Sequence, residues 1–314
     1  MSHPSNGKPA DNTKRFADYD AQIAHLISKG LLIDDKPYAL RMLRELGYFA
    51  LISGYRTIFY TDDDRRYKPG TTFKNIVDLY NVDHELRSIF LEYILHIERH
   101  LKSIASYAFL SRFGDGQEAY LTAENYSPER PRDVHRLIDL LRSILAARGK
   151  YRYIDHYLAA RRPVPLWSAI NALTMGSMIK FVECAAPPVL HEICSAFPEL
   201  TAETLPPLLS AVYAIRNCCA HNEWLYDLRL RDPIPDLKLH MLLQIPRDET
   251  GYLSGTADLF AGVIALKYLL SAERFVDFKD ELIAVLDHYP KENTTFSHDE
   301  LMGLMGFPEG WREL

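Results

Sequence analysis

Apolar side chains recur at steps of three and four residues over one long stretch of the chain, residues 79–108. They are Leu79, Val82, Leu86, Ile89, Phe90, Tyr93, Ile94, Ile97, Leu101, Ile104 and Ala108. An α-helix completes a turn in about 3.6 residues, so this spacing places these side chains along one face. The stretch therefore predicts a single long amphipathic helix. We expect Thr71 or Thr72 to cap its start and Gly114 to Gly116 to end it.

Helical periodicity also dominates the rest of the chain, which contains no internal repeat and no low-complexity tract. Helices are predicted over residues 19–29, 37–46, 133–147, 154–160, 166–184, 188–197, 206–225, 257–271 and 273–288. Pro233, Pro235 and Pro246 interrupt residues 232–256, and residues 237–245 have the pattern of an isolated strand. The prediction is an all-α (mainly α) fold with a short irregular or β segment near residues 232–256.

The predicted helices fall into two groups. Residues 1–70 are expected to form a small N-terminal helical unit, with a polar tail and an acidic loop that contains Asp62, Asp63 and Asp64. Residues 71–314 are expected to form a larger helical domain. A typical domain has about 150 residues, so a chain of 314 residues suits one large domain or two smaller ones.

Composition excludes several classes of protein. With 47% hydrophobic and 25% charged residues, the chain resembles globular proteins and not disordered, collagen-like or disulfide-rich ones. Its longest apolar stretch, Leu259 to Leu270, contains Lys267 and is too short to cross a bilayer. The polar N-terminal residues lack the apolar core of a signal peptide, so we expect a cytoplasmic protein without membrane partners.

The four cysteines are Cys184, Cys194, Cys218 and Cys219, and they form no C-x-x-C pair. In a reducing compartment we expect them to be small buried side chains. The alternative, a metal site that includes His191, has too few ligands at poor spacing. No metal and no cofactor is therefore predicted.

Positive charge is concentrated in one segment, although the whole chain has a net charge of −6. Residues 129–162 contain nine Lys and Arg against four Asp and Glu, a net charge of +5, with three tyrosines among them. This mixture suits phosphate contacts and base stacking, and the alternative is an ordinary solvated helix face. The candidate RNA-binding residues are Arg132, Arg136, Arg142, Arg148, Lys150 and Arg152. The nearby Trp167 is predicted to belong to the core.

The sequence has no glycine-rich phosphate loop, no H-E-x-x-H and no G-x-S-x-G, which are signatures of common enzyme classes. Instead, Arg216, Asn217 and His221 interrupt an apolar helix. The R-x4-H spacing alone is weak, because about one match is expected by chance and Arg130…His135 is a second one. The apolar surroundings carry more weight, since a buried Arg or His is costly unless it is paired.

A guanidinium and an imidazole together suit RNA cleavage without a metal. The guanidinium binds phosphate oxygens, and an imidazole can take a proton from a ribose 2′-hydroxyl or give one to a 5′-oxygen. On an ideal helix, five residues turn through about 500°, which leaves Arg216 and His221 roughly 140° apart. The pair converges if Arg216 reaches round, if the helix distorts, or if two copies meet across a twofold axis. The alternative is an Arg and a His that only brace helices.

Five stretches of sequence, in order, are LGYFALISGY (46–55), FKNIVDLYNVDHELRSIFLEYILHIERHLK (73–102), VPLWSAINALTMGSMIKF (164–181), IRNCCAHNEWLYD (215–227) and GFPEGW (306–311). Together they resemble the Abi-like abortive-infection family of the AbiD/AbiF kind, a branch of the HEPN superfamily. The resemblance implies a HEPN-like helical bundle that dimerises. It also implies metal-independent endoribonuclease activity and a role in phage resistance, in some relatives together with a structured small RNA.

The resemblance also implies roles for particular residues. Arg216 and His221 would be the catalytic R-x4-H pair, with Asn217 as the polar residue that follows the Arg. Glu98 and Tyr226 are candidate supporting residues, and the alternatives are an i, i+4 pair of Glu98 with Lys102 and a packed core aromatic. Asn222 stands where many relatives would have a second His or a basic residue, which puts the RNA contacts in doubt.

The leading hypothesis is therefore a homodimeric, metal-independent endoribonuclease of an anti-phage system that cleaves RNA by 2′-hydroxyl attack. The first alternative is a non-catalytic RNA-binding or antitoxin-like scaffold that holds a small structured RNA. The second alternative is a regulator that binds only other proteins.

Overall fold

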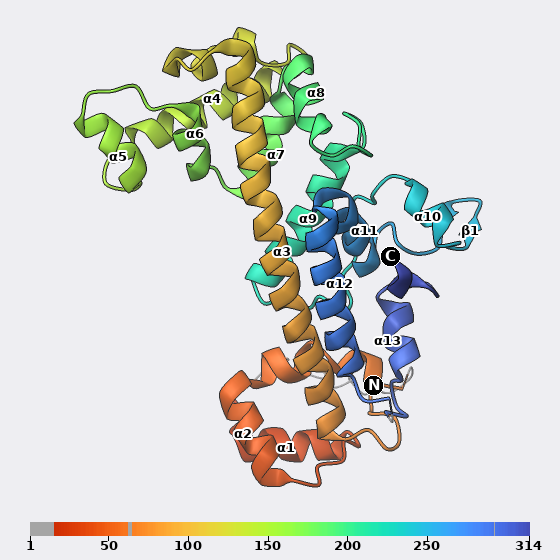
Figure 1. Ribbon diagram of the computed structural model, residues 1–314. Coiled ribbons are helices and arrows are strands. Elements are labelled where there is room, and N and C mark those ends of the chain that lie inside the picture. Colours follow the sequence, from red (N-terminus) through yellow and green to blue (C-terminus); the bar gives the residue numbers. More distant parts are fainter. Residues whose placement is uncertain (1–15, 62–64, 292) are drawn as a thin grey trace, which may run out of the picture. The chain divides into compact units, whose positions relative to one another are not determined.

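The computed structural model describes residues 16–61, 65–291 and 293–314 (Figure 1). Clustering of the chain separates two compact units, and their described parts are residues 16–80 with 293–297 and residues 81–291 with 298–314. We call them unit 1 and unit 2. The mainly α fold is confirmed, with one small two-stranded sheet in the described chain. The predicted acidic loop at 62–64 and polar tail at 1–15 lie outside the described residues.

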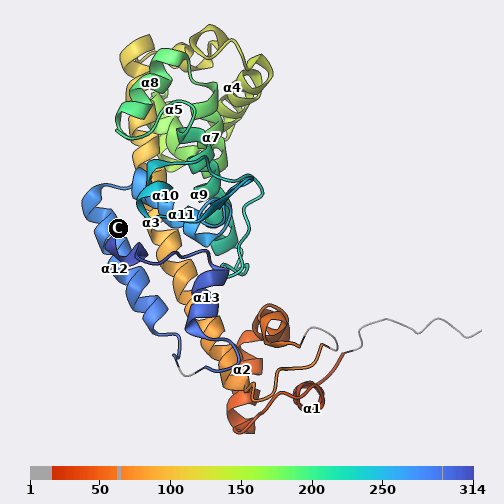
Figure 2. The same cartoon turned by 90° about the vertical axis from the view of Figure 1, so that its right-hand side faces the viewer.

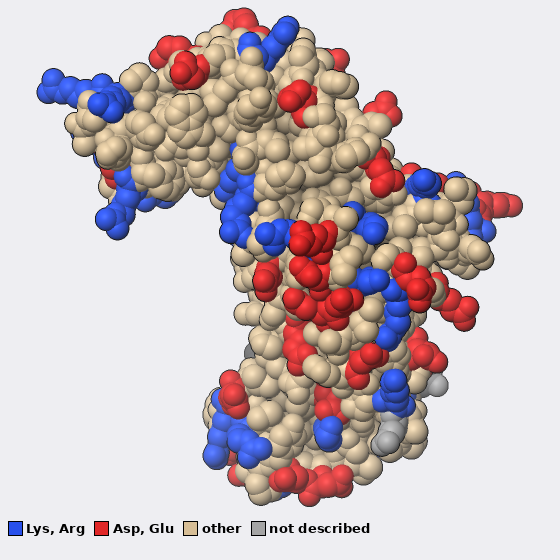
Figure 3. All heavy atoms as spheres, in the orientation of Figure 1, with Lys and Arg blue, Asp and Glu red and all other residues tan. Residues whose placement is uncertain are grey.

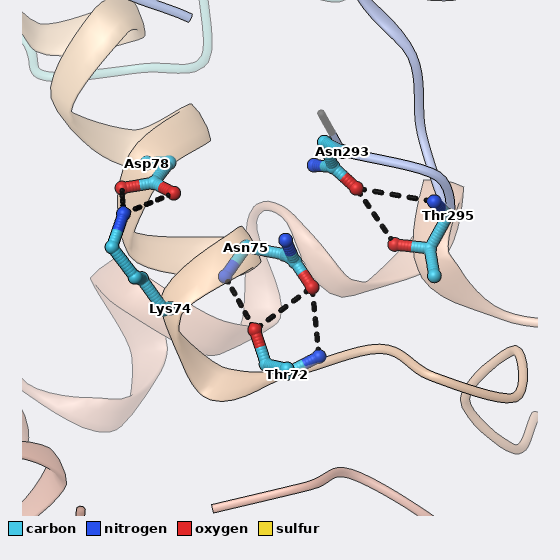
Figure 4. A network of polar contacts seen from close by, with 6 residues as sticks. All are labelled: Thr72, Lys74, Asn75, Asp78, Asn293 and Thr295. Carbon is cyan, nitrogen blue, oxygen red and sulfur yellow. Dashed lines mark hydrogen bonds and ion pairs between the residues drawn. The ribbon is translucent and has the colours of Figure 1, made fainter. Parts of the chain in front are cut away.

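The predicted long helix is present as α3, Phe73–Phe113. Its start is fixed by Thr72, whose Oγ1 accepts a hydrogen bond from the Asn75 backbone N at 3.2 Å, while Asn75 Oδ1 accepts from the Thr72 N at 2.8 Å (Figure 4). This reciprocal pair satisfies N–H groups that have no partner within the helix. The helix ends before Gly114, whose φ of 83° suits glycine better than other residues.

Unit 1 contains α1 (Tyr19–Ser28), α2 (Lys36–Leu46), a π-helical turn (Phe49–Ser53), a 3-10 turn (Arg56–Phe59) and the first turns of α3. Its core includes the buried side chains of Leu43, Tyr55 and Phe59. Phe296 returns late in the chain and packs edge-on against Phe59, with ring centroids 6.0 Å apart. Just before it, Asn293 Oδ1 accepts hydrogen bonds from the backbone N and the hydroxyl of Thr295 (Figure 4).

Unit 2 contains the rest of α3 and the remaining helices. They are α4 (Pro131–Ala146), α5 (Arg152–Ala159), α6 (Leu166–Ala169), α7 (Met175–Cys184), α8 (Pro187–Ser195), α9 (Leu205–Ala220), α10 (Lys238–Leu242), α11 (Leu259–Leu269), α12 (Ala272–Asp287) and α13 (His298–Leu304). Short 3-10 turns cover Gln117–Leu121, Ala123–Asn125, Ile170–Ala172 and Trp311–Glu313. The antiparallel strands β1 (Arg247–Asp248) and β2 (Gly251–Tyr252) pair Arg247 with Tyr252.

The core of unit 2 forms where α9 and α12 pack with α3 and α11. Helix α11, the longest apolar stretch of the sequence, is buried along nearly its whole length. Its Gly262 allows close packing, because a Cβ there would lie 2.3 Å from Cδ1 of Ile215 in α9. Helix α12 lies beside α3 in both views, and the ring of its Phe278 packs edge-on against Phe90 and Tyr93 (Figures 1 and 2).

Three details of the sequence prediction are wrong. Residues 166–184 are not one helix, because the chain breaks at Leu173 and Thr174 caps a new helix by accepting from the Ser177 N. The helix predicted over residues 206–225 ends at Ala220. The strand predicted over residues 237–245 is largely helix α10, and the strand pair follows it. Within the described residues, no helix is both long and apolar enough to cross a membrane.

Candidate functional site

The candidate residues lie at the C-terminal end of α9. Arg216 and Asn217 belong to its last turns, and His221 is the C-cap residue, whose backbone N donates to the Asn217 carbonyl at 3.0 Å. Asn222 has a φ of 55°, a left-handed conformation that Asn adopts more readily than most residues. The helix therefore stops at His221, and the sequence had predicted that it would continue.

The three side chains are available for a ligand. His221 is exposed, while Arg216 and Asn217 are half-buried. In the described part of the chain, none of the three side chains has a hydrogen-bond or ion-pair partner, and the Arg216 Nε is buried without an acceptor. A buried guanidinium N–H without an acceptor is costly, so an anionic ligand that reaches it would bind favourably.

The backbone after His221 is held by two buried charged residues of α3. Asp83 is completely buried, and its Oδ1 accepts hydrogen bonds from the backbone N of Leu225 at 3.0 Å and of Tyr226 at 2.6 Å. Arg87 is 5% exposed, forms an ion pair with Asp83 and donates to the Glu223 carbonyl at 3.3 Å. Together they fix the segment that follows the histidine.

Sequence reasoning missed this pair. The available signal was an Asp and an Arg spaced i, i+4 within the apolar stretch of the long helix, where Leu79, Leu86 and Phe90 are fully buried. Charged residues at such positions are rarely buried unless they have partners. That pattern predicts a polar brace, although it does not show which backbone segment the brace holds.

The neighbouring cysteines are part of the core and not of the reactive surface. Cys218 and Cys219 are buried, and burial raises the pKa of each thiol to about 12. Nearby carboxylates, Asp83 and Glu223, act in the same direction on Cys218. Both thiols are therefore protonated at neutral pH and are poor nucleophiles. This confirms that they are buried, as are Cys184 and Cys194.

The two predicted supporting residues have partners of their own. Glu98 forms an ion pair with Lys102 at 2.8 Å, with side chains 14% and 12% exposed, so the i, i+4 pair is present and half-buried. The Tyr226 side chain is buried, and its backbone N donates to Asp83. Glu98 lies 11 residues beyond Arg87 on α3, which corresponds to about 16 Å along the helix.

The predicted RNA-binding residues are all exposed, on α4, on α5 and on the segment between them. Arg136 and Arg142 form ion pairs with Asp133 and Asp139 at 3.5 Å. The other four have no ion pair with any described residue, and they are Arg132, Arg148, Lys150 and Arg152. Figure 3 shows Lys and Arg side chains gathered around α5.

Exposed aromatic side chains accompany these cations. Tyr153 on α5 is 41% exposed and Trp167 on α6 is 50% exposed, so the prediction that Trp167 belongs to the core is wrong. Both line a shallow hollow of about 670 Å³ together with Tyr157. No hydrogen bond or ion pair among described residues links this surface to the end of α9.

One chain supplies one Arg216 and one His221, and α9 is regular up to Ala220. The helical turn therefore leaves the two side chains roughly 140° apart around the helix. No group of three or more His, Cys, Asp or Glu side chains in the described chain is arranged to hold a metal ion. What the end of α9 offers is a guanidinium, an amide and an exposed imidazole on a braced backbone.

The comparisons with known proteins agree with the sequence resemblance. The model of a family described as Abi-like protein matches residues 41–227, which include α3, α9 and the Arg216…His221 pair. No curated protein and no solved structure matches the chain. Since the family model covers more than half of the sequence, the chain belongs to the Abi-like protein family.

Proposed function

We propose that the protein is a metal-independent endoribonuclease of the HEPN type that acts in the cytoplasm. Membership of the Abi-like family indicates a role in abortive infection. The observation that carries the nuclease proposal is the end of α9. There Arg216, Asn217 and His221 have no partners among the described residues, while Asp83 and Arg87 hold the following backbone.

Each of the three residues has a role in the proposed reaction. Arg216 binds the scissile phosphate, and Asn217 orients the phosphate or the imidazole by a hydrogen bond. His221 removes the proton from the ribose 2′-hydroxyl, the 2′-oxygen attacks phosphorus, and the bond from phosphorus to the 5′-oxygen breaks. A proton from an imidazolium reaches the 5′-oxygen. The products carry a 2′,3′-cyclic phosphate and a 5′-hydroxyl, so no metal or cofactor is needed.

The base and the acid need two imidazoles in different protonation states, and each chain supplies one His221. A homodimer with the ends of both α9 helices at its twofold axis provides both. The angular separation of Arg216 and His221 on one helix favours the same arrangement, because each chain can then complete the other's site.

The test is the His221→Ala variant, assayed on RNA by the amount of 2′,3′-cyclic phosphate product. We expect cleavage to fall by about 10²- to 10⁴-fold, the usual contribution of a general acid or base. His135→Ala is the matched control, because His135 belongs to the other R-x4-H match and is also exposed. The proposal is wrong if both variants cleave RNA as the unmodified protein does, or if both lose activity equally.

The second candidate function, a non-catalytic scaffold for a small structured RNA, is favoured by the exposed cations around α5. A combined Arg148→Gln, Lys150→Gln and Arg152→Gln variant should bind RNA more weakly. It should also reduce the slope of log K against log[salt] by about 0.7 per lost contact on single strands. The matched control changes Lys36, Arg41 and Arg44 of α2, which are equally exposed. RNA binding that survives His221→Ala, without cleavage by the unmodified protein, would favour the scaffold over the nuclease.

A further inference from the structure

A cavity of about 710 Å³ lies within unit 2, between α3, the segment that joins α8 to α9, and the junction of α11 with α12. Three cations line it: Arg99 of α3, Lys267 of α11 and Arg274 of α12. None of them forms an ion pair within the described part of the chain, and Glu199 is the one carboxylate among the lining residues. The cavity is therefore a local site of uncompensated positive charge.

The two guanidiniums are held close together by a shared histidine. Arg99 contacts Nδ1 of His96 at 2.8 Å, and Arg274 contacts Nε2 of the same ring at 3.3 Å. An uncharged imidazole accepts a hydrogen bond at one nitrogen only, so one guanidinium lacks a satisfactory acceptor there. Burial and the charges of Arg274 and Arg99 lower the pKa of His96, which is consistent with a positive potential at this point. An anion between the guanidiniums would satisfy both.

The opposite wall of the cavity is largely apolar. It is formed by Ile97, Phe197, Pro198, Leu269 and Leu270. The volume lies within the range of about 300–1,000 Å³ that is usual for small-molecule sites, which combine an apolar lining with a few polar groups. The outer face of α12 is rich in Asp and Glu (Figure 3), so the cations of the cavity are not part of a general basic surface. A ligand with one anionic group and one flat apolar part fits this lining.

The cavity is separate from the end of α9. Asp83, which holds the backbone after His221, lies 13 residues before His96 on the same helix. At about 1.5 Å per residue, these positions are about 20 Å apart along α3. A ligand in the cavity therefore does not occupy the position of the substrate proposed for Arg216 and His221.

We propose that this cavity binds a nucleoside monophosphate, with the phosphate between Arg99 and Arg274 and the base against Phe197, Pro198 and Leu270. Arg is well suited to the phosphate because its planar fork makes two parallel hydrogen bonds. The nucleotide is either free or the terminal nucleotide of an RNA, since both present the same groups. The proposal does not depend on the nuclease activity, because it concerns binding at a different place.

The experiment is a calorimetric titration of the full-length protein with inorganic phosphate and with adenosine 5′-monophosphate. We expect saturable binding of both, tighter for the nucleotide. Arg99→Gln and Arg274→Gln should each weaken nucleotide binding by roughly 10- to 100-fold, the usual effect of losing charge-assisted hydrogen bonds. Arg112→Gln is the matched control, because Arg112 is an exposed arginine of α3 outside the cavity.

The outcomes separate the proposal from its competitors. Absence of saturable binding at millimolar nucleotide, or equal weakening in all three variants, would overturn it. Displacement of the nucleotide by a short 5′-phosphorylated RNA assigns the site to an RNA end, and failure to displace it assigns the site to a free nucleotide. Repeating the titration with His221→Ala should leave the affinity unchanged, so the result can be interpreted whether or not the protein cleaves RNA.

Discussion

At the scale of single residues, the end of α9 combines fixed and free groups. Asp83 and Arg87 are buried and fully engaged with each other and with the backbone of Glu223, Leu225 and Tyr226. Arg216 and His221 have no such partners in the described chain. A site that must bind a substrate needs this division, because free groups act accurately only when their backbone is held in place.

The buried ion pair should dominate local stability. We expect Asp83→Ala to lower the free energy of unfolding by about 3–5 kcal/mol, because it leaves the Arg87 charge buried and two backbone N–H groups without their acceptor. Urea denaturation measures the change. Asp78→Ala is the control, since its pair with Lys74 is also i, i+4 on α3 but has an exposed lysine. That variant should lose less than about 1 kcal/mol. Equal losses in the two variants would show that the buried pair does not act as a brace.

The cysteines of α9 should respond to alkaline pH. Burial raises the pKa of Cys218 and Cys219 to about 12 from the usual 9.0, so unfolding releases protons above pH 9. The stabilising contribution is complete below pH 9 and is lost as pH rises towards 12. At pH 8 the folded protein should resist iodoacetamide, and both thiols should be labelled in urea, as mass spectrometry can show. Rapid labelling of the native protein at pH 8 would contradict this.

The sequence allowed the prediction of which residues could perform chemistry but not of how they are supported. Arg216 and His221 are recognisable because polar residues interrupt an apolar helix, a local pattern. Asp83 lies 142 residues before Leu225 in the chain, and only the tertiary structure brings its carboxylate to that backbone. Trp167 shows the same limit, since its apolar character suggests a core position and its helix leaves it half exposed.

At the scale of elements, the long apolar periodicity correctly predicted α3, because a 41-residue helix repeats its signal many times. Boundaries were harder where one residue decides them. Thr174 starts a new helix by capping it, and the left-handed Asn222 ends α9 two residues after Cys219 and Ala220. Residues 237–245 were assigned wrongly because a short apolar run does not distinguish strand from helix.

The close contact of α9 with α11 makes a prediction about one glycine. Gly262→Ala places a Cβ 2.3 Å from Cδ1 of Ile215, so the helices must separate or Ile215 must move. We expect a loss of about 1–3 kcal/mol in the free energy of unfolding, partly restored by the additional change Ile215→Val. Gly303→Ala in α13 is the control, because no atom lies within 4 Å of its Cβ position. Thermal denaturation of the three variants distinguishes overpacking from a simple gain in helix propensity.

At the scale of the whole molecule, charge is segregated. The chain has a net charge of −6, while residues 129–162 carry +5. A molecule of this kind is not attracted to RNA by its total charge, so RNA contact must depend on a local surface and weaken steeply with salt. The exposed cations and aromatics around α5 provide such a surface, and the end of α9 provides the candidate chemistry.

The final prediction concerns the proposed dimer. If one His221 acts as base and the other as acid in a single composite site, a dimer with one His221→Ala chain is inactive. Equal mixing of unmodified and variant chains, after exchange of subunits, then leaves about one quarter of the activity of the same total amount of unmodified protein. If each chain works alone, about one half remains. His135→Ala chains, mixed in the same way, should leave activity unchanged, because that histidine is outside the site. The ratio separates a shared site from two independent ones, and it does so without knowledge of the natural RNA.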